Sequence, residues 1–121
     1  MKRILVIDDA ATVRMYHKSI LRSEGYEVEE AINGIEAIEK ALNGHFDIYI
    51  VDINMPKLDG YGFLKELRTL EIPQAPAIMV STESDDTDKK KAFTCGANYY
   101  LVKPVKPEQL ATIVKLLIRG E

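Results

Sequence analysis

The run from Ile48 to Val51 restricts the possible folds of this chain more than any other segment. It holds four consecutive residues that are all β-branched or aromatic, which favours a strand buried on both faces of a parallel sheet. Asp52 follows directly, and Pro56 cannot continue a ladder of strand hydrogen bonds, so the chain leaves the sheet between them. Ligands of open α/β sheets bind at this edge. A carboxylate that only ends a strand and supports a turn would show the same local pattern, so the rest of the chain must decide its role.

Short apolar runs alternate with helical patterns along the whole chain. Strands are predicted at 4–7, 26–29, 48–51, 77–80 and 99–102, with helices at 11–23, 35–42 and 60–70, one ending near Cys95 and one starting at Pro107. Right-handed crossovers place helices on both faces of such a sheet, which predicts a doubly wound α/β fold. Acidic residues alternate along 26–29, as is typical of a sheet edge. This edge strand favours a five-stranded parallel sheet of flavodoxin-like order, 2-1-3-4-5, with five helices.

Composition narrows the function classes. A chain of 121 residues, 46% hydrophobic, is expected to form one domain over residues 1–121. The net charge of -3 offers no basic excess for DNA binding. A single cysteine, Cys95, excludes an internal disulfide and favours a reducing compartment, while the first apolar run ends at Asp8 and is too short for membrane insertion. We therefore expect a cytoplasmic protein.

Polar residues follow four of the five predicted strands. Asp8 and Asp9 end the first, Asp52 the third, Ser81 the fourth and Lys103 the fifth. In the order 2-1-3-4-5 these four strand ends converge on one crevice. Three carboxylates gathered there would repel one another unless a cation intervenes. Because every candidate ligand is an oxygen, Mg²⁺ is the favoured metal.

A metal ion held by these carboxylates would leave coordination positions open for a phosphoryl group. The backbone carbonyl of Asn54 could complete the protein's share of the ligands, while Lys103 and the Ser81 hydroxyl would hold phosphoryl oxygens. Phosphoryl transfer depends mainly on positioning and charge neutralisation, so an ionised aspartate can be the acceptor. Asp52, central among these groups, is the predicted acceptor. Taken singly, the acidic pair could instead cap the first helix, and Lys103 could be an ordinary surface lysine.

Together these residues resemble the receiver domains of two-component response regulators. The matching motifs are Asp8-Asp9, Val51-Asp52-Ile53-Asn54-Met55-Pro56, Asp59-Gly60, Ser81 and Lys103-Pro104. The resemblance implies a phosphoacceptor switch rather than an enzyme. In it, a sensor histidine kinase donates a phosphoryl group to Asp52, and affinity for a partner protein changes. It also implies that Asp9, Asp52 and the Asn54 carbonyl bind Mg²⁺, with Asp8 assisting through water.

The resemblance assigns further residues to switching. Ser81 would hydrogen-bond the phosphoryl group, and Tyr100 matches the aromatic residue whose burial follows that bond, although an aromatic residue in an edge strand is often plain packing. Asn54 and Glu83 match positions that accompany fast loss of the phosphoryl group. The Lys103-Pro104 bond matches a cis peptide.

For the partners and the biological role, the resemblance leaves more than one alternative. The resemblance extends to stand-alone chemotaxis regulators, which implies no effector domain and a downstream target such as the flagellar motor or another signalling protein. Single-domain phosphorelay intermediates without a chemotaxis role share this plan. We expect a monomer, with dimerisation through the fourth helix, fifth strand and fifth helix left open. Lys89-Lys90-Lys91 is interpreted as a solvated helix face or, alternatively, a docking patch.

Two other classes share the architecture or the nucleophile. A flavodoxin-like electron-transfer protein needs hydroxyl and glycine groups around the flavin phosphate after the first strand, where Asp8 and Asp9 would repel it. An aspartyl-nucleophile phosphohydrolase usually has a second carboxylate two residues after the nucleophile, where this chain has Asn54. His17 and His45 are predicted to be surface residues. Packing roles are predicted for three methionines, Met15, Met55 and Met79.

Overall fold

Five strands pair into one parallel sheet in the order β2-β1-β3-β4-β5, as predicted. The computed structural model describes residues 1–119. The strands are β1 (Arg3–Ile7), β2 (Glu27–Ala31), β3 (Ile48–Asp52), β4 (Ala77–Ser81) and β5 (Tyr99–Val102). In their register Asp52 pairs with Val80, and Ser81 pairs with Val102. The carboxyl ends of the three strands β3, β4 and β5 therefore lie level with one another.

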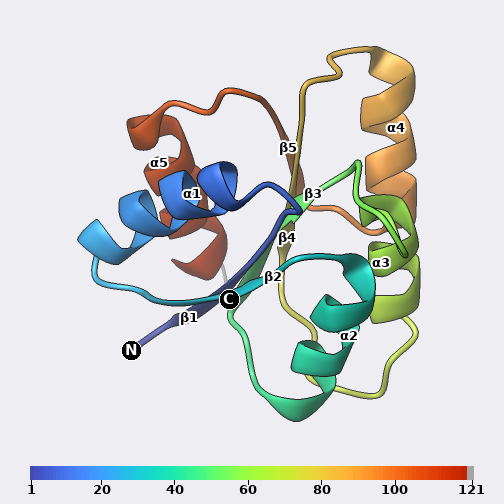
Figure 1. The fold of residues 1–121 in the computed structure, drawn as a ribbon, viewed down its shortest axis with the longest axis horizontal. Helices are drawn as coiled ribbons and strands as arrows, with labels where there is room; N and C mark the ends of the chain where they lie inside the picture. The colour runs from blue at the N-terminus through green and yellow to red at the C-terminus, as the bar shows by residue number, and fades with distance from the viewer. Residues whose placement is uncertain (120–121) are drawn as a thin grey trace.

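Helices cover both faces of the sheet (Figure 1). The helices are α1 (Ala11–Ser23), α2 (Gly34–Asn43), α3 (Gly60–Leu67), α4 (Asp86–Cys95) and α5 (Pro107–Arg119). Two of them, α1 and α5, lie against one face, and α2, α3 and α4 lie against the other. No helix of the described residues is long and apolar enough to cross a membrane.

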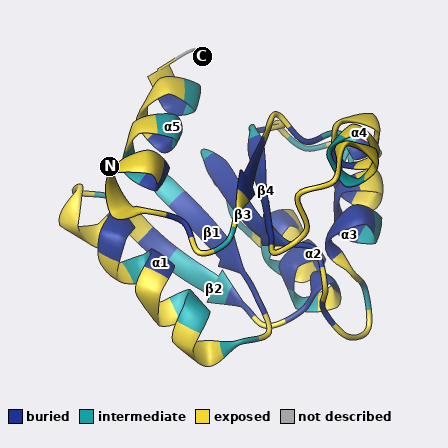
Figure 2. Ribbon diagram, turned by 90° about the horizontal axis from the view of Figure 1, so that it is seen from above, coloured by how far each residue is buried: buried dark blue, intermediate teal, exposed yellow. Residues whose placement is uncertain are grey.

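The two helical layers create two apolar cores separated by the sheet. Alternate residues of β1 serve different cores: Leu5 and Ile7 pack on the side of α2, α3 and α4, whereas Ile4 and Val6 pack on the side of α1 and α5. Every residue of β3 is buried, as its unbroken apolar sequence predicts. Figure 2 shows the buried central strands between helices whose outer faces are exposed, with the edge strand β2 only partly buried. A strand buried on both faces is what brings Asp52 to the end of the central strand with little solvent around it.

Local hydrogen bonds fix where the helices near the strand ends begin. Asn33 Oδ1 accepts the Glu36 N–H at 2.8 Å, and Glu36 Oε1 accepts the Ile32 N–H at 2.9 Å, a reciprocal cap for α2. Asp59 Oδ1 accepts the Gly62 N–H at 2.8 Å and begins α3. A Cβ at Gly60 would lie 2.4 Å from the Asp52 carbonyl oxygen. Only glycine therefore lets α3 start this close to the end of β3.

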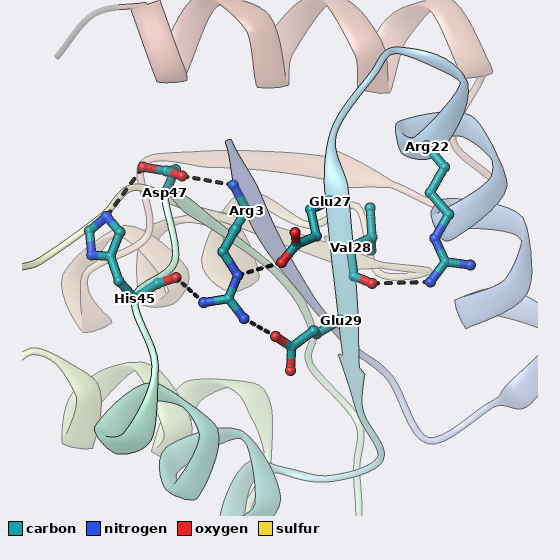
Figure 3. A network of polar contacts seen from close by, with 7 residues as sticks. All are labelled: Arg3, Arg22, Glu27, Val28, Glu29, His45 and Asp47. Carbon is teal, nitrogen blue, oxygen red and sulfur yellow. Dashed lines mark hydrogen bonds and ion pairs between the residues drawn. The ribbon is translucent and has the colours of Figure 1, made fainter. Parts of the chain in front are cut away.

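Arg3 ties the beginning of β1 to its neighbours (Figure 3). Its backbone N–H donates to Asp47 Oδ2 at 2.7 Å, and its guanidinium donates to the His45 carbonyl at 2.7 Å. The same guanidinium pairs with Glu27 at 2.8 Å and with Glu29. These ion pairs are partly exposed, so each contributes at most about 1 kcal/mol. They join the edge strand β2 to the sheet at the end away from the polar strand ends.

Several predicted boundaries differ from the structure. The strand predicted at 26–29 occupies 27–31, and the helix predicted to reach Leu70 ends at Leu67. The Gln74 side chain donates to the Leu67 carbonyl at 2.8 Å and to the Leu70 carbonyl at 3.2 Å. This long loop contact satisfies carbonyls at the end of α3, so the helix need not continue.

Two side chains of α1 are placed opposite to the prediction. His17, predicted at the surface, is 3% exposed, whereas Met15, predicted to pack, is 68% exposed. His17 lies on the buried face with Ile20 and Leu21, and four-residue spacing from Val13 places it there. The predictions for His45, Met55 and Met79 are confirmed, because His45 is exposed and both methionines are buried.

Candidate functional site

The carboxyl ends of the strands bring the predicted acidic and basic groups together. Lys103 Nζ lies 2.9 Å from Asp8 Oδ2 and 2.9 Å from Asp52 Oδ1, so one ammonium bridges two carboxylates. Carboxylate oxygens of Asp8, Asp9 and Asp52 all lie within 4.8 Å of one another. These four residues come from three separate strand ends, which only the predicted strand order makes adjacent.

The acidic residues differ in exposure and in their hydrogen-bond partners. Asp8 and Asp52 are 2% and 7% exposed, while Asp9 is exposed. Asp8 Oδ1 accepts the Ala10 N–H at 2.9 Å, and the Asp8 carbonyl accepts a hydrogen bond from Arg14 Nη1 at 2.8 Å. The acidic pair does not cap α1, because the N-cap residue is Ala10 and no side chain forms a cap hydrogen bond there. The other oxygen of Asp8 pairs with Lys103.

The electrostatics of the site leave negative charge to be neutralised. Burial raises the pKa of Asp52, the hydrogen bond from Lys103 opposes this, and the charges of Asp8 and Asp9 raise it further. Burial lowers the pKa of Lys103, but its bonds to Asp8 and Asp52 outweigh burial and raise it above its usual value. Lys103 is therefore an ammonium at neutral pH. Three carboxylates and one ammonium have a formal charge of -2, which a divalent cation would balance.

The donor set also suits magnesium. Every side-chain atom of the cluster that could bind a metal ion is a carboxylate oxygen, the ligand type that Mg²⁺ prefers. Asn54 lies exposed in the loop between β3 and α3, and no described residue donates a hydrogen bond to its carbonyl. That carbonyl is therefore available as a further ligand. The residues present fit the predicted metal in charge and in ligand type.

Asp9→Asn should weaken Mg²⁺ binding at least tenfold, because it removes one of the negative charges that hold the cation. An NMR titration of the backbone amides with MgCl₂ measures this. Asp85→Asn is the matched control: Asp85 belongs to a second acidic group, with Glu83 and Asp88, that is largely exposed. Equal Mg²⁺ affinity of wild type and Asp9→Asn would exclude Asp9 as a ligand.

Ser81 and Tyr100 lie beside this cluster and share one partner. Ser81 is 1% exposed, and its Oγ accepts the Glu83 N–H at 3.1 Å. Tyr100 is 9% exposed, and its hydroxyl donates to the Glu83 carbonyl at 2.8 Å. The ring therefore already has the inward position that the resemblance associates with phosphorylation. The side chain of Glu83 itself is exposed.

Other predicted features can be placed as well. The Lys103–Pro104 peptide is cis, as predicted, and Cys95 is buried. Lys91 lies over the Tyr61 ring at 4.3 Å, so one member of the lysine run packs on an aromatic face. Arg14, which the sequence interpretation missed, joins the Asp8 carbonyl to Glu30, and Lys18 also pairs with Glu30. The only sequence signal for this was the basic spacing of Arg14 and Lys18 along one helix.

Comparisons with known sequences agree with this geometry. Residues 4–115 match the family described as response regulator receiver domain. The transcriptional regulatory protein ResD of Bacillus subtilis is 35% identical over 117 residues, which are 97% of this chain and 48% of ResD. SrrA of Staphylococcus aureus is also 35% identical, over 96% of this chain and 47% of its own length. The chain thus spans about half the length of these curated relatives.

Comparisons with solved structures give the same family. The chemotaxis protein CheY4 of Vibrio cholerae has a TM-score of 0.91 at 36% identity, covering 97% of this chain and 98% of CheY4. The receiver domain of the sensor histidine kinase PA1611 from Pseudomonas aeruginosa has a TM-score of 0.91 at 30% identity, covering 99% and 98%. That structure has a magnesium ion coordinated in its active site cleft. The chain described here therefore belongs to the response regulator receiver domain family.

Proposed function

We propose that Asp52 accepts a phosphoryl group from the phosphohistidine of a sensor histidine kinase in a Mg²⁺-dependent reaction. The observation that carries this proposal is the Lys103 ammonium, 2.9 Å from both Asp8 and Asp52 at the end of the central strand. A receiver domain is a phosphoacceptor switch rather than a classical enzyme, so one transfer per chain is the expected outcome.

The transfer needs little covalent chemistry from the protein. An Asp52 oxygen forms a bond to phosphorus while the phosphorus–nitrogen bond to the donor imidazole breaks, and the electron pair of that bond stays on the imidazole. Bound Mg²⁺ would supply neutralisation of charge on the phosphoryl oxygens. We assign Asp9, Asp52 and the Asn54 carbonyl to the metal, with Asp8 acting through water. Lys103, freed from Asp52 when the phosphoryl group arrives, would pair with that group.

Asp52→Asn should abolish the addition of one phosphoryl mass when the protein is incubated with acetyl phosphate and Mg²⁺. The amide keeps the size of the side chain and removes the nucleophilic carboxylate. Intact mass spectrometry measures the adduct. Asp59→Asn is the control, because asparagine also caps a helix and Asp59 lies outside the carboxylate cluster. Equal labelling of Asp52→Asn and wild type would refute Asp52 as the acceptor.

We further propose that Ser81 and Tyr100 transmit phosphorylation to the surface. A phosphoryl group on Asp52 would accept the Ser81 hydroxyl, and the inward Tyr100 ring packs beside the segment that this bond would draw in. The bond from the Tyr100 hydroxyl to the Glu83 carbonyl supports this role. Asn54 and Glu83 are both exposed, and we assign them to tuning the loss of the phosphoryl group.

Tyr100 lies inward in the structure. In solution we expect its ring to exchange with outward positions, and beryllofluoride with Mg²⁺, a phosphoryl mimic, should raise the inward population. NMR of isotope-labelled tyrosine rings measures this population. Ser81→Ala should remove the response, because it removes the hydroxyl that would bind the mimic. A Tyr100 signal that is the same with and without beryllofluoride would contradict the assigned switch.

The relatives support two candidates for the wider role of this chain. The similarity to CheY4, at 36% identity, supports a chemotaxis-like regulator. ResD and SrrA, each about twice as long, support a second candidate: a receiver module that controls a transcriptional output. In both cases we propose a cytoplasmic location and a monomer that can pair through α4, β5 and α5. The protein captured by the beryllofluoride form alone would identify the target.

A further inference from the structure

An open cavity of about 370 Å³ lies between α1 and the loop that joins β5 to α5. Its wall is mostly apolar and includes Val13, Tyr16, Pro104 and Val105. The Tyr16 hydroxyl donates to the Val105 carbonyl at 2.9 Å, which ties the helix to the loop across the cavity. This size falls within the usual range of small-molecule sites, which are concave, mostly apolar and provided with a few polar groups.

His17 supplies the polar group of this cavity. The residue is 3% exposed and lines the cavity, and no hydrogen bond joins its ring to another described residue. No fully buried polar side-chain atom of the described residues lacks a partner, so the ring nitrogens of His17 are accessible to solvent, and the residue lines this cavity. Water can hydrogen-bond these nitrogens, and a ligand that enters the cavity can take the place of that water.

The surroundings favour an uncharged partner. Burial lowers the pKa of His17 to about 4, so at neutral pH its imidazole has one N–H donor and one acceptor nitrogen. Lys103 also lines the cavity, but its ammonium is already paired with Asp8 and Asp52, so it offers little to an anion. The flat rings of Tyr16 and His17 suit a planar occupant.

We propose that this cavity is a binding site for a small, uncharged heteroaromatic molecule that donates a hydrogen bond to His17. The site is separate from the carboxylate cluster but shares Lys103 with it, so an occupant lies against a residue of the phosphoryl-acceptor site. The proposal does not depend on phosphorylation of Asp52, because binding is measured on the unmodified protein.

Indole is the probe, and indene, which has the same bicyclic shape without the N–H, is its matched comparison. Titration of indole should shift the amide signals of Val13, Thr82 and Lys103 in a saturable manner. Loss of the hydrogen bond should make indene bind roughly fivefold more weakly. His17→Phe should weaken indole by a similar factor and leave indene unaffected, while His45→Phe, at an exposed histidine, should change neither.

A second variant tests the cavity itself. Val13→Phe fills the space without altering the imidazole and should abolish the shifts for both probes. The spectra of the variants report whether each is folded. The proposal is overturned if wild type shows no saturable shifts at the cavity. It is equally overturned if indole and indene bind alike, or if indole binding survives Val13→Phe.

Discussion

Lys103→Met should destabilise the protein by about 3 kcal/mol when no divalent cation is present, because two buried carboxylates lose the ammonium between them. Methionine keeps most of the aliphatic length and removes only the charge. Added Mg²⁺ should restore more stability to Lys103→Met than to wild type, since the variant site is more negative and binds the cation more tightly. Urea unfolding with and without MgCl₂ measures both effects.

The control for this experiment is Lys106→Met, at an exposed lysine of the following loop. That substitution should change the free energy of unfolding by less than about 0.5 kcal/mol and leave the Mg²⁺ response unchanged. If Lys103→Met were as stable as Lys106→Met in the absence of Mg²⁺, Lys103 would not be the counter-charge of the cluster.

The second large effect concerns pH and His17. Burial lowers the pKa of His17 from 6.5 to about 4, with Asp8 opposing the shift and Lys103 adding to it. Between these values the unfolded chain binds a proton that the native protein does not, so stability rises with pH in this window. The contribution is fully present above pH 6.5 and is lost as pH falls to about 4. The whole shift corresponds to about 3 kcal/mol.

His17→Phe should flatten this part of the pH–stability curve, and His45→Phe should leave it unchanged. Asp52, whose pKa is raised, contributes with the opposite sign, since its stability term is lost as pH rises. The difference between wild type and His17→Phe isolates the histidine, because Asp52 is present in both. Urea unfolding at several pH values between 4 and 7 gives the curves, and parallel curves for the two proteins would show that His17 is not buried in its neutral form.

The sequence predicted the parts of this structure that depend on local pattern and chain order. Local patterns predict the buried strand β3, the edge strand β2 and the glycine that begins α3 after Asp59. The strand order then makes Asp8, Asp52 and Lys103 adjacent. Such features are encoded by neighbours in the sequence together with a general rule of sheet topology.

Features that depend on contacts between distant segments were not predictable in this way. The end of α3 at Leu67 depends on Gln74, which approaches from the following loop. The inward Tyr100 depends on a carbonyl 17 residues away in the chain. None of these partners is visible in a window of neighbouring residues.

The central claim is that one particular carboxylate accepts the phosphoryl group. Borohydride reduces an acyl phosphate to an alcohol, so protein treated with acetyl phosphate, Mg²⁺ and then borohydride should contain homoserine at position 52. Peptide mass spectrometry locates the change. We predict homoserine at position 52 only, and only when Mg²⁺ is present. Reduction at Asp8 or Asp9 instead, or the same yield with the metal removed by chelation, would contradict this account.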